Sequence, residues 1–128
     1  MLDLSNRMFT NLKHNDMIVI PNNIIPFPGF LAINLFELVF VRKEYWDERS
    51  ETDKAITLNH EAIHTAQMRE LLWVFFYIIY FFEWLIRLCF INGSQAYEKT
   101  SFEVEAYDNQ ACAEYLKHRK HYAQWRKK

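Results

Sequence analysis

The fold is decided by the stretch LNHEAIHTAQMRELLWVFFYIIYFFEWLIRLCFI, residues 58–91, which contains neither glycine nor proline. Because the next such residue along the chain is Gly93, the pattern predicts one helix over residues 58–91. Thr57 and Asn59 are residue types that cap helices, so either is a candidate N-cap. The second half, from Leu71 to Ile91, begins with twelve consecutive apolar residues and is apolar on every side in its middle. It must therefore be covered by other parts of the chain or by a partner.

Shorter elements are expected on both sides of this helix. Upstream, IPNNIIPFPG (residues 20–29) interrupts regular structure, and FLAINLFELVFV (residues 30–41) predicts a buried strand or a hairpin within a strand region of residues 18–45. Downstream, NGSQ (residues 92–95) predicts a loop before a last helix and a basic tail over residues 98–128. We therefore expect a single α+β domain, in which two helices pack with a short antiparallel sheet or hairpin.

The composition excludes several classes of protein. The chain has 128 residues, of which 51% are hydrophobic and 17% aromatic, so burial of apolar surface can offset the entropy lost on folding and a disordered chain is excluded. Cys89 and Cys112 are too few for the disulfide framework of a small secreted domain, and both are expected to be free thiols. The first residues contain no apolar run of signal-peptide length, so we expect no signal peptide and an intracellular location.

The HEAIH segment carries the residue types of a zinc site. On a helix, His60 and His64 lie one turn apart on the same side, about 6 Å from each other, so both imidazoles can reach one ion. Glu61 points about 100° away around the helix, beside the ion, where a general base can take a proton from a zinc-bound water. We therefore predict that His60 and His64 bind Zn2+ and that Glu61 is the catalytic residue.

A catalytic zinc site needs a third protein ligand and leaves a fourth position for water. The next histidine along the chain, His118, belongs to the polar tail, so a carboxylate ligand is expected. Glu103 and Glu105 are the main candidates, because both lie near the start of a predicted helix in TSFEVEAYD, residues 100–108. Glu70 is a weaker candidate, since it lies on the same helix as the two histidines but faces elsewhere.

Together, these segments resemble the motifs of the gluzincin metallopeptidases, in which HExxH on one helix is completed by a Glu on a second helix. The local likeness is to membrane zincins of the CAAX-prenyl-protease type, whose second motif reads F-E-x-x-A-D and is matched here by FEVEA. The resemblance implies a zincin-like fold with Glu103 as the third ligand and Glu105 as the alternative. Where the family has an Asp that orients a zinc histidine, this chain has Tyr107 followed by Asp108. Both of these residues, together with Gln67, are candidates for supporting the ligands.

The same resemblance implies the activity and the substrate. We expect a zinc-dependent metalloprotease that hydrolyses a peptide or protein substrate with a water activated by Glu61. The resemblance also implies that the strand in residues 30–41 offers its edge to an extended substrate. The alternative is a non-catalytic protein with a degenerate zincin site, which either binds zinc without turnover or interacts with a membrane surface.

Two segments suggest further partners. The segment from Leu71 to Ile91 is long enough to span a bilayer, for which about 20 residues are needed, but Glu83 and Arg87 oppose a simple span. We therefore expect it to contact a membrane surface or a second copy in a homo-oligomer, or to be covered by the core. The tail KHRKHYAQWRKK (residues 117–128) holds six of the fifteen Lys and Arg residues and no acid, which suits an anionic membrane surface. Nucleic acid is not the expected partner.

Overall fold

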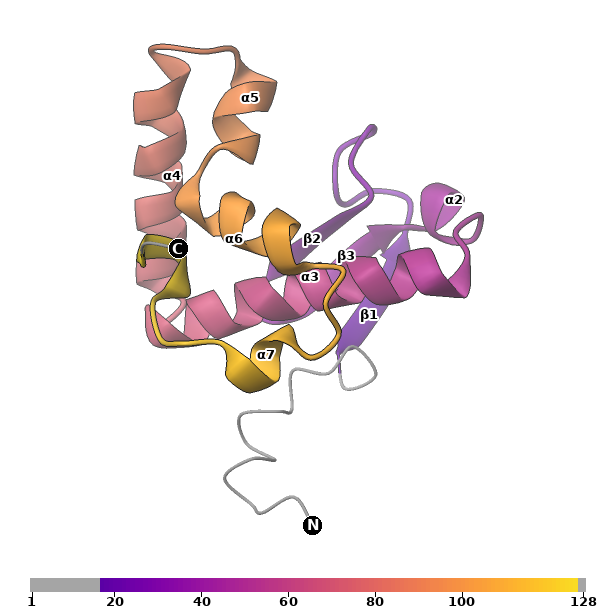
Figure 1. Ribbon diagram of the computed structural model, residues 1–128. Helices are drawn as coiled ribbons and strands as arrows, with labels where there is room; N and C mark the ends of the chain where they lie inside the picture. Colours follow the sequence, from indigo (N-terminus) through magenta and orange to yellow (C-terminus); the bar gives the residue numbers. More distant parts are fainter. Residues whose placement is uncertain (1–16, 127–128) are drawn as a thin grey trace.

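The computed structural model describes residues 17–126, in which a small sheet packs with helices (Figure 1). The sheet consists of β1 (Ile18–Asn22), β2 (Ala32–Leu35) and β3 (Leu38–Arg42). The helices that follow are α2 (Lys43–Trp46), α3 (Glu51–Glu70), α4 (Val74–Leu88), α5 (Gly93–Glu98), α6 (Ser101–Asn109), α7 (Tyr115–His118) and the 3-10 helix η2 (Ala123–Trp125). The α+β fold class predicted from the sequence is confirmed.

The sheet has the strand order β1-β3-β2. β2 and β3 form an antiparallel hairpin in which Leu35 lies opposite Leu38. Its two turn residues, Phe36 and Glu37, have φ angles of 51° and 74°, the left-handed conformation that tight hairpin turns require. The pair of β2 and β3 is the hairpin expected from the sequence, while β1 runs parallel to β3, so the sheet as a whole is mixed and not antiparallel. The parallel pairing arises because the chain after β1 forms β2 before it returns as β3.

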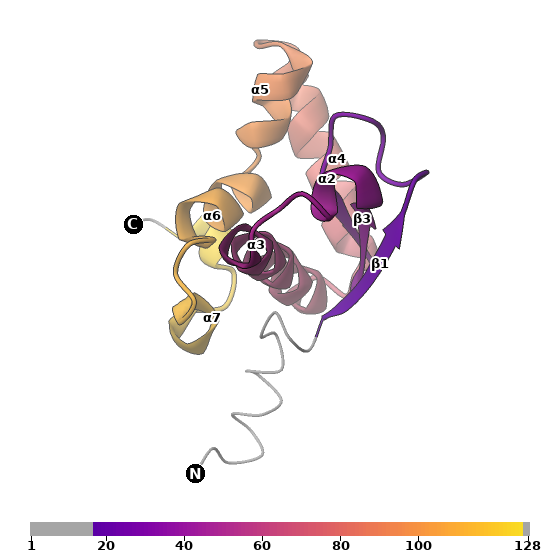
Figure 2. The ribbon, with the colours of Figure 1, turned by 90° about the vertical axis from the view of Figure 1, so that its right-hand side faces the viewer.

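Helix α3 runs through the middle of the molecule, with the sheet on one side and α6 and α7 on the other (Figure 2). Two groups of buried side chains hold these layers together. The first group lies around β3, α2 and α3 and consists of Val39, Val41, Trp46 and Leu58. The second joins α3, α4 and α6 and consists of Met68, Phe76 and Phe102. Because α3 contacts both layers, ten of its side chains are buried.

The single helix expected over residues 58–91 is two helices, α3 and α4, which are bent by 110° relative to each other. The chain turns at Leu72 and Trp73, which have φ angles of 54° and 59° although neither is glycine. Glu37 in the hairpin turn explains the corner. It accepts hydrogen bonds from Arg69 at the end of α3 (2.6 Å) and from Trp73 Nε1 just before α4 (2.7 Å). A tertiary contact therefore sets the corner, and no local sequence signal marks it.

Two other expected boundaries are also corrected. α3 begins at Glu51, because the Oγ of Ser50 accepts a hydrogen bond from the backbone N–H of Asp53 (3.1 Å) and caps the helix there instead of at Thr57 or Asn59. The last helix expected from residue 98 into the basic tail is divided into α6, α7 and η2, and the loop expected at residues 92–95 is mostly helical, because α5 begins at Gly93. The prediction of free thiols at both cysteines is confirmed, and both side chains are exposed.

One face of α4 is exposed and wholly apolar, so of the three alternatives for this segment, complete covering by the core is excluded. Between 40% and 61% of the surface of its side chains is exposed, and they recur every three or four residues: Val74, Phe75, Ile78, Phe81, Phe82, Leu85 and Ile86. Within residues 17–126, no single helix is both long and apolar enough to cross a bilayer, although α3 and α4 meet that test as a bent pair. Contact of this face with a membrane surface or a second copy stays a prediction.

Candidate metal centre

Two helices bring three predicted ligands to one point. The Nε2 atoms of His60 and His64 lie 3.1 Å apart on α3. The carboxylate of Glu103 on α6 lies 3.0 Å from Nε2 of His60 and 2.9 Å from Nε2 of His64. All three side chains are buried. Among the described residues, these three form the one group of His, Cys, Asp and Glu side chains placed to share an ion.

The local sequence of α6 directs Glu103 toward the histidines. Thr100 caps the helix by accepting a hydrogen bond from the backbone N–H of Glu103 (3.3 Å), so Glu103 lies in the first turn. Phe102 is fully buried and packs edge-on against Phe76 at a centroid distance of 4.9 Å and parallel to Tyr80 at 5.7 Å. The cap and this aromatic anchor fix the rotation of α6. They leave the Glu103 carboxylate facing α3.

Two glutamines fix the proton positions on the histidines. Gln67 Oε1 lies 2.8 Å from Nδ1 of His64, and Gln110 Oε1 lies 2.8 Å from Nδ1 of His60. An amide oxygen can only accept a hydrogen bond, so each Nδ1 carries the proton and each Nε2 of the neutral ring presents a lone pair to the other ligands. This arrangement of a ring N–H held by an outer partner is typical of metal-binding histidines.

The donor set therefore fits a zinc ion. Two imidazole lone pairs and two carboxylate oxygens converge, and Tyr80 supplies a single hydrogen bond, from its hydroxyl to Glu103 Oε2 (2.9 Å). Converging acceptors need a cation between them, either protons or a metal. Ligand atoms of a tetrahedral zinc lie about 3.4 Å from one another, close to the 2.9–3.1 Å observed.

The pKa values of the side chains around this point show that the site favours positive charge. Burial acts to lower the pKa of His64, but the Glu103 carboxylate outweighs it and raises that pKa to about 9. Burial acts to raise the pKa of Glu103, yet the two imidazoles hold it well below its ordinary range. Burial and the adjacent Glu103 carboxylate both raise the pKa of Tyr80, so its hydroxyl remains a hydrogen-bond donor.

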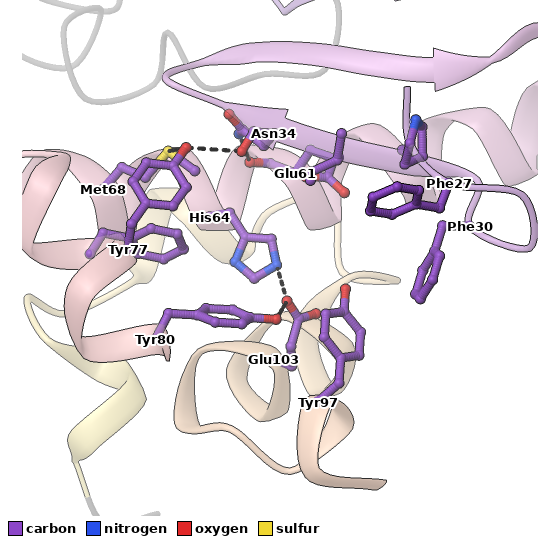
Figure 3. Close-up of a pocket in the computed structure, with 14 residues that line it drawn as sticks. Phe27, Phe30, Asn34, Glu61, His64, Met68, Tyr77, Tyr80, Tyr97 and Glu103 are labelled. Atoms are coloured by element: carbon purple, nitrogen blue, oxygen red, sulfur yellow. Dashed lines mark hydrogen bonds and ion pairs between the residues drawn. The ribbon is translucent and has the colours of Figure 1, made fainter. Parts of the chain in front are cut away.

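A cavity of about 280 Å3 opens beside His64 and Glu103, and Glu61 lines it as well (Figure 3). The rest of the wall is mainly aromatic and apolar, with Phe27, Phe30, Met68, Phe76, Tyr77 and Tyr97 among its residues. Glu61 is buried, and burial raises the pKa of its carboxyl group against the opposing effect of the two histidines. Asn34 on β2 donates hydrogen bonds to the backbone oxygen of Glu61 (2.9 Å) and to Thr65 Oγ1 (2.8 Å). The sheet is thereby fixed against α3 at the position of Glu61.

The structure places the alternative ligands away from the centre. The carboxylate of Glu105 pairs with Arg119, at 2.5 Å between Oε2 and Nε, and the carboxylate of Glu70 also pairs with Arg119, at 3.0 Å. These contacts correct the expectation that Glu105 could replace Glu103. Within the basic tail, Arg119 is not available to an anionic partner, because only 5% of its side chain is exposed, whereas contact of the rest of the tail with a membrane surface stays a prediction. His118 lies outside the ligand group, as expected.

Of the three residues predicted to support the ligands, Gln67 and Tyr107 contact a ligand histidine, and Asp108 lies at the surface. Gln67 contacts His64, as described above. Tyr107 packs its ring against that of His60, at a centroid distance of 4.6 Å, and burial and Glu103 raise its pKa to about 12. Asp108 is exposed and lines a separate groove beside the C-terminal segment. Orientation of His60 through its Nδ1 comes from Gln110, and neither Tyr107 nor Asp108 provides it.

Sequence reasoning missed Gln110 and Tyr80. Sequence spacing could have indicated Gln110, because it lies seven residues after Glu103 and so two turns further along the same side of a helix. No local spacing indicates Tyr80, since it reaches Glu103 only because the corner after α3 turns α4 toward α6.

No protein-family model matches the chain, and no curated protein or solved structure matches it significantly.

Proposed function

We propose that the protein is a zinc-dependent metallopeptidase in which His60, His64 and Glu103 hold the ion and Glu61 is the general base. The observation that carries this proposal is the convergence of two Nδ1-protonated imidazoles and one carboxylate from two helices onto a single buried point. A set of three nitrogen and oxygen ligands is the set that catalytic zinc sites use, because it leaves one position for water.

Each residue of the site has a defined task in this proposal. When bound, zinc acts as a Lewis acid and lowers the pKa of a coordinated water to about 7. Glu61 lines the cavity next to His64 and Glu103, within reach of a water placed there, so it can take the proton of the attacking water and return it to the leaving amine. Gln67 and Gln110 each accept a hydrogen bond from an Nδ1, so the neutral rings present their lone pairs at Nε2, and Tyr80 holds the Glu103 carboxylate.

The cavity suits a peptide with one large apolar side chain. Its volume of about 280 Å3 lies near the lower limit of small-molecule pockets and is large enough for one bulky side chain. β2 is an edge strand, and the backbone carbonyl of Asn34 points to its free edge, where it accepts a hydrogen bond from Tyr77 (3.1 Å). Residues two apart in a strand face the same edge, so Ala32 directs its backbone N–H and C=O there too. An extended peptide can pair with Ala32 beside the site.

The ligand assignment is tested by metal content. The native protein should bind one zinc ion per chain, His60→Ala and Glu103→Ala should lose it, and Glu61→Gln should keep it. At saturating zinc, Glu105→Ala should still hold one ion, because the Glu105 carboxylate pairs with Arg119 and lies outside the ligand set. Zinc retained by His60→Ala would contradict the proposed ligand set.

The activity is tested by mass spectrometry of a peptide mixture after incubation with the zinc-loaded protein. Glu61→Gln should reduce the cleavage rate by about 100-fold or more, because it removes the general base while leaving the ligands in place. Glu51→Gln is the matched control, because Glu51 lies on the same helix and 94% of its side chain is exposed. Equal cleavage by the native protein and Glu61→Gln would refute the catalytic role. A protein that binds zinc and cleaves no peptide would favour the non-catalytic alternative.

A further inference from the structure

A buried chain of hydrogen bonds runs from the candidate metal centre to the C-terminal segment. His64 Nδ1 donates to Gln67 Oε1 (2.8 Å), and Gln67 Nε2 donates to Glu105 Oε1 (2.9 Å). Arg119 then donates to both oxygens of Glu105, from Nε at 2.5 Å and from Nη2 at 3.0 Å. The side chains along this path are buried, with 0% of Gln67 exposed and only 5% of the Arg119 side chain.

The negative charge of Glu105 determines which atoms donate and which accept along this path of hydrogen bonds. A carboxylate only accepts hydrogen bonds, so it selects the NH2 end of the Gln67 amide, which also donates to the backbone oxygen of Phe102 (3.0 Å). The oxygen end of Gln67 must then face His64, which places the proton on Nδ1 and the lone pair on Nε2. A neutral Gln at position 105 can either accept or donate, so it does not select one orientation of Gln67.

Arg119 is what allows Glu105 to remain a buried carboxylate. A charge removed from water needs an opposite charge and hydrogen bonds of good geometry, and the two-point contact with Arg119 supplies both. Tyr115 adds a hydrogen bond from its hydroxyl to Glu105 Oε2 (2.6 Å). Arg119 is itself held by Glu70 (3.0 Å) and Gln124 Oε1 (2.9 Å). Residues 115–124, which begin at α7 beside α3 in Figure 1, therefore provide the far end of this hydrogen-bond path.

The two ligand histidines differ in this respect. His60 is supported by Gln110, a half-buried residue at the end of α6. In the part of the chain that the structure describes, no hydrogen bond joins Gln110 to Arg119, Glu105 or Gln67. His60 thus serves as an internal reference for any effect that passes through Arg119 to His64.

We propose that Arg119, acting through Glu105 and Gln67, is a positioning residue that fixes the proton and the ring orientation of His64 for metal binding. The C-terminal segment is in this way part of the metal centre, although none of its residues touches the ion site. This inference rests on the proposed zinc site and adds a determinant of its affinity.

The test compares the zinc dissociation constants of full-length variants, measured by competition with a chromophoric chelator. Glu105→Gln and Arg119→Gln should each weaken zinc binding by about tenfold or more, the usual effect of removing an outer partner of a metal-binding histidine. Arg119→Lys, which keeps the charge but not the two-point contact, should fall between Arg119→Gln and the native protein. Lys117→Gln is the matched control, because Lys117 lies on α7 and pairs with Glu114 at the surface. It should leave the dissociation constant unchanged.

A spectroscopic measurement separates positioning from a general loss of structure. In zinc-loaded protein with 15N-labelled histidine, the Nδ1–H signals of His64 and His60 report the two outer hydrogen bonds. Glu105→Gln should shift or broaden the His64 signal and leave the His60 signal in place. Loss of both signals together would overturn the proposal, because it would indicate loosening of the whole site.

The outcomes distinguish this inference from the proposed function. A native protein without zinc affinity would overturn both. Native zinc binding together with unchanged dissociation constants in folded Glu105→Gln and Arg119→Gln would overturn the positioning role alone. If Arg119→Gln does not fold, Glu105→Gln decides the question, because it conserves size and shape while removing the charge.

Discussion

Zinc-free protein should lose stability as the pH rises from about 6 to about 9. In the folded chain, the Glu103 carboxylate raises the pKa of His64 from its ordinary value of 6.5 to about 9, in spite of burial. A folded-state pKa above the unfolded value means that the folded state binds the proton more tightly. The resulting stabilisation is fully present below pH 6.5 and is lost as the pH rises through about 9. Burial also raises the pKa of Glu61 above its ordinary value of 4.5, so its contribution has the same sign, but it begins to be lost at a lower pH than that of His64.

The size of this effect follows from the shift. One pH unit corresponds to about 1.4 kcal/mol, so the difference between 6.5 and about 9 sets an upper value of about 3.5 kcal/mol. Since domains of this size are stable by about 5–15 kcal/mol, such a loss is readily measured. With zinc bound, the ion takes the place of the proton between the ligands, and stability should not fall over this range.

The assay is urea denaturation of chelator-treated and zinc-loaded protein at half-unit pH intervals between pH 6 and pH 9.5. His64→Asn should remove most of the slope in the zinc-free series, while His118→Asn, a change at an exposed tail histidine, is the control. A zinc-free protein whose free energy of unfolding stays constant or rises over this range would refute the reasoning, as would an unchanged slope in His64→Asn.

Three further predictions concern the free energy of unfolding of the zinc-free protein, measured in urea. Glu37→Gln should lower it by about 1–3 kcal/mol, because the two donors that hold the corner lose their charged acceptor, and an unchanged value would show that the corner does not depend on this contact. Leu72→Gly should raise it by up to about 1 kcal/mol, because the residue has a φ angle of 54° and is 64% exposed, whereas a loss above 1 kcal/mol would contradict the strain. Phe102→Ala should lower it by about 3–5 kcal/mol, while Phe27→Ala, at an 81% exposed residue, should change it by less than about 0.5 kcal/mol, and similar effects of the two would contradict the assigned core.

The parts of the site that follow from local spacing could be predicted from the sequence. His60 and His64 share a face because four residues make about one helical turn, and this holds wherever the helix begins or ends. Glu103 and Glu105 were both candidates because they lie near the start of a predicted helix, and only the resemblance to the gluzincin motifs favoured Glu103. The hairpin was expected because β-branched and aromatic residues dominate residues 30–41.

The parts that depend on distant contacts could not be predicted. The bend after α3 requires Glu37 to meet Arg69 and Trp73, more than thirty residues later, and nothing near Leu72 signals it. Arg119 looks like one more cation in a basic tail until the fold shows that its partners are Glu105 and Glu70. The role of Tyr80 depends on the same bend, because only the corner directs α4 toward α6.

The distance in sequence between the ligands has a consequence for a chain that has no disulfide between its two cysteines. His60 and Glu103 are 43 positions apart, and the whole hairpin of α4 and α5 lies between them. A covalent cross-link that closes a loop of this length stabilises a protein by about 4 kcal/mol in the chain-entropy account. An ion shared by these two residues would act as such a cross-link. Removal of the metal should therefore make the hairpin of α4 and α5 the first region that a protease cuts.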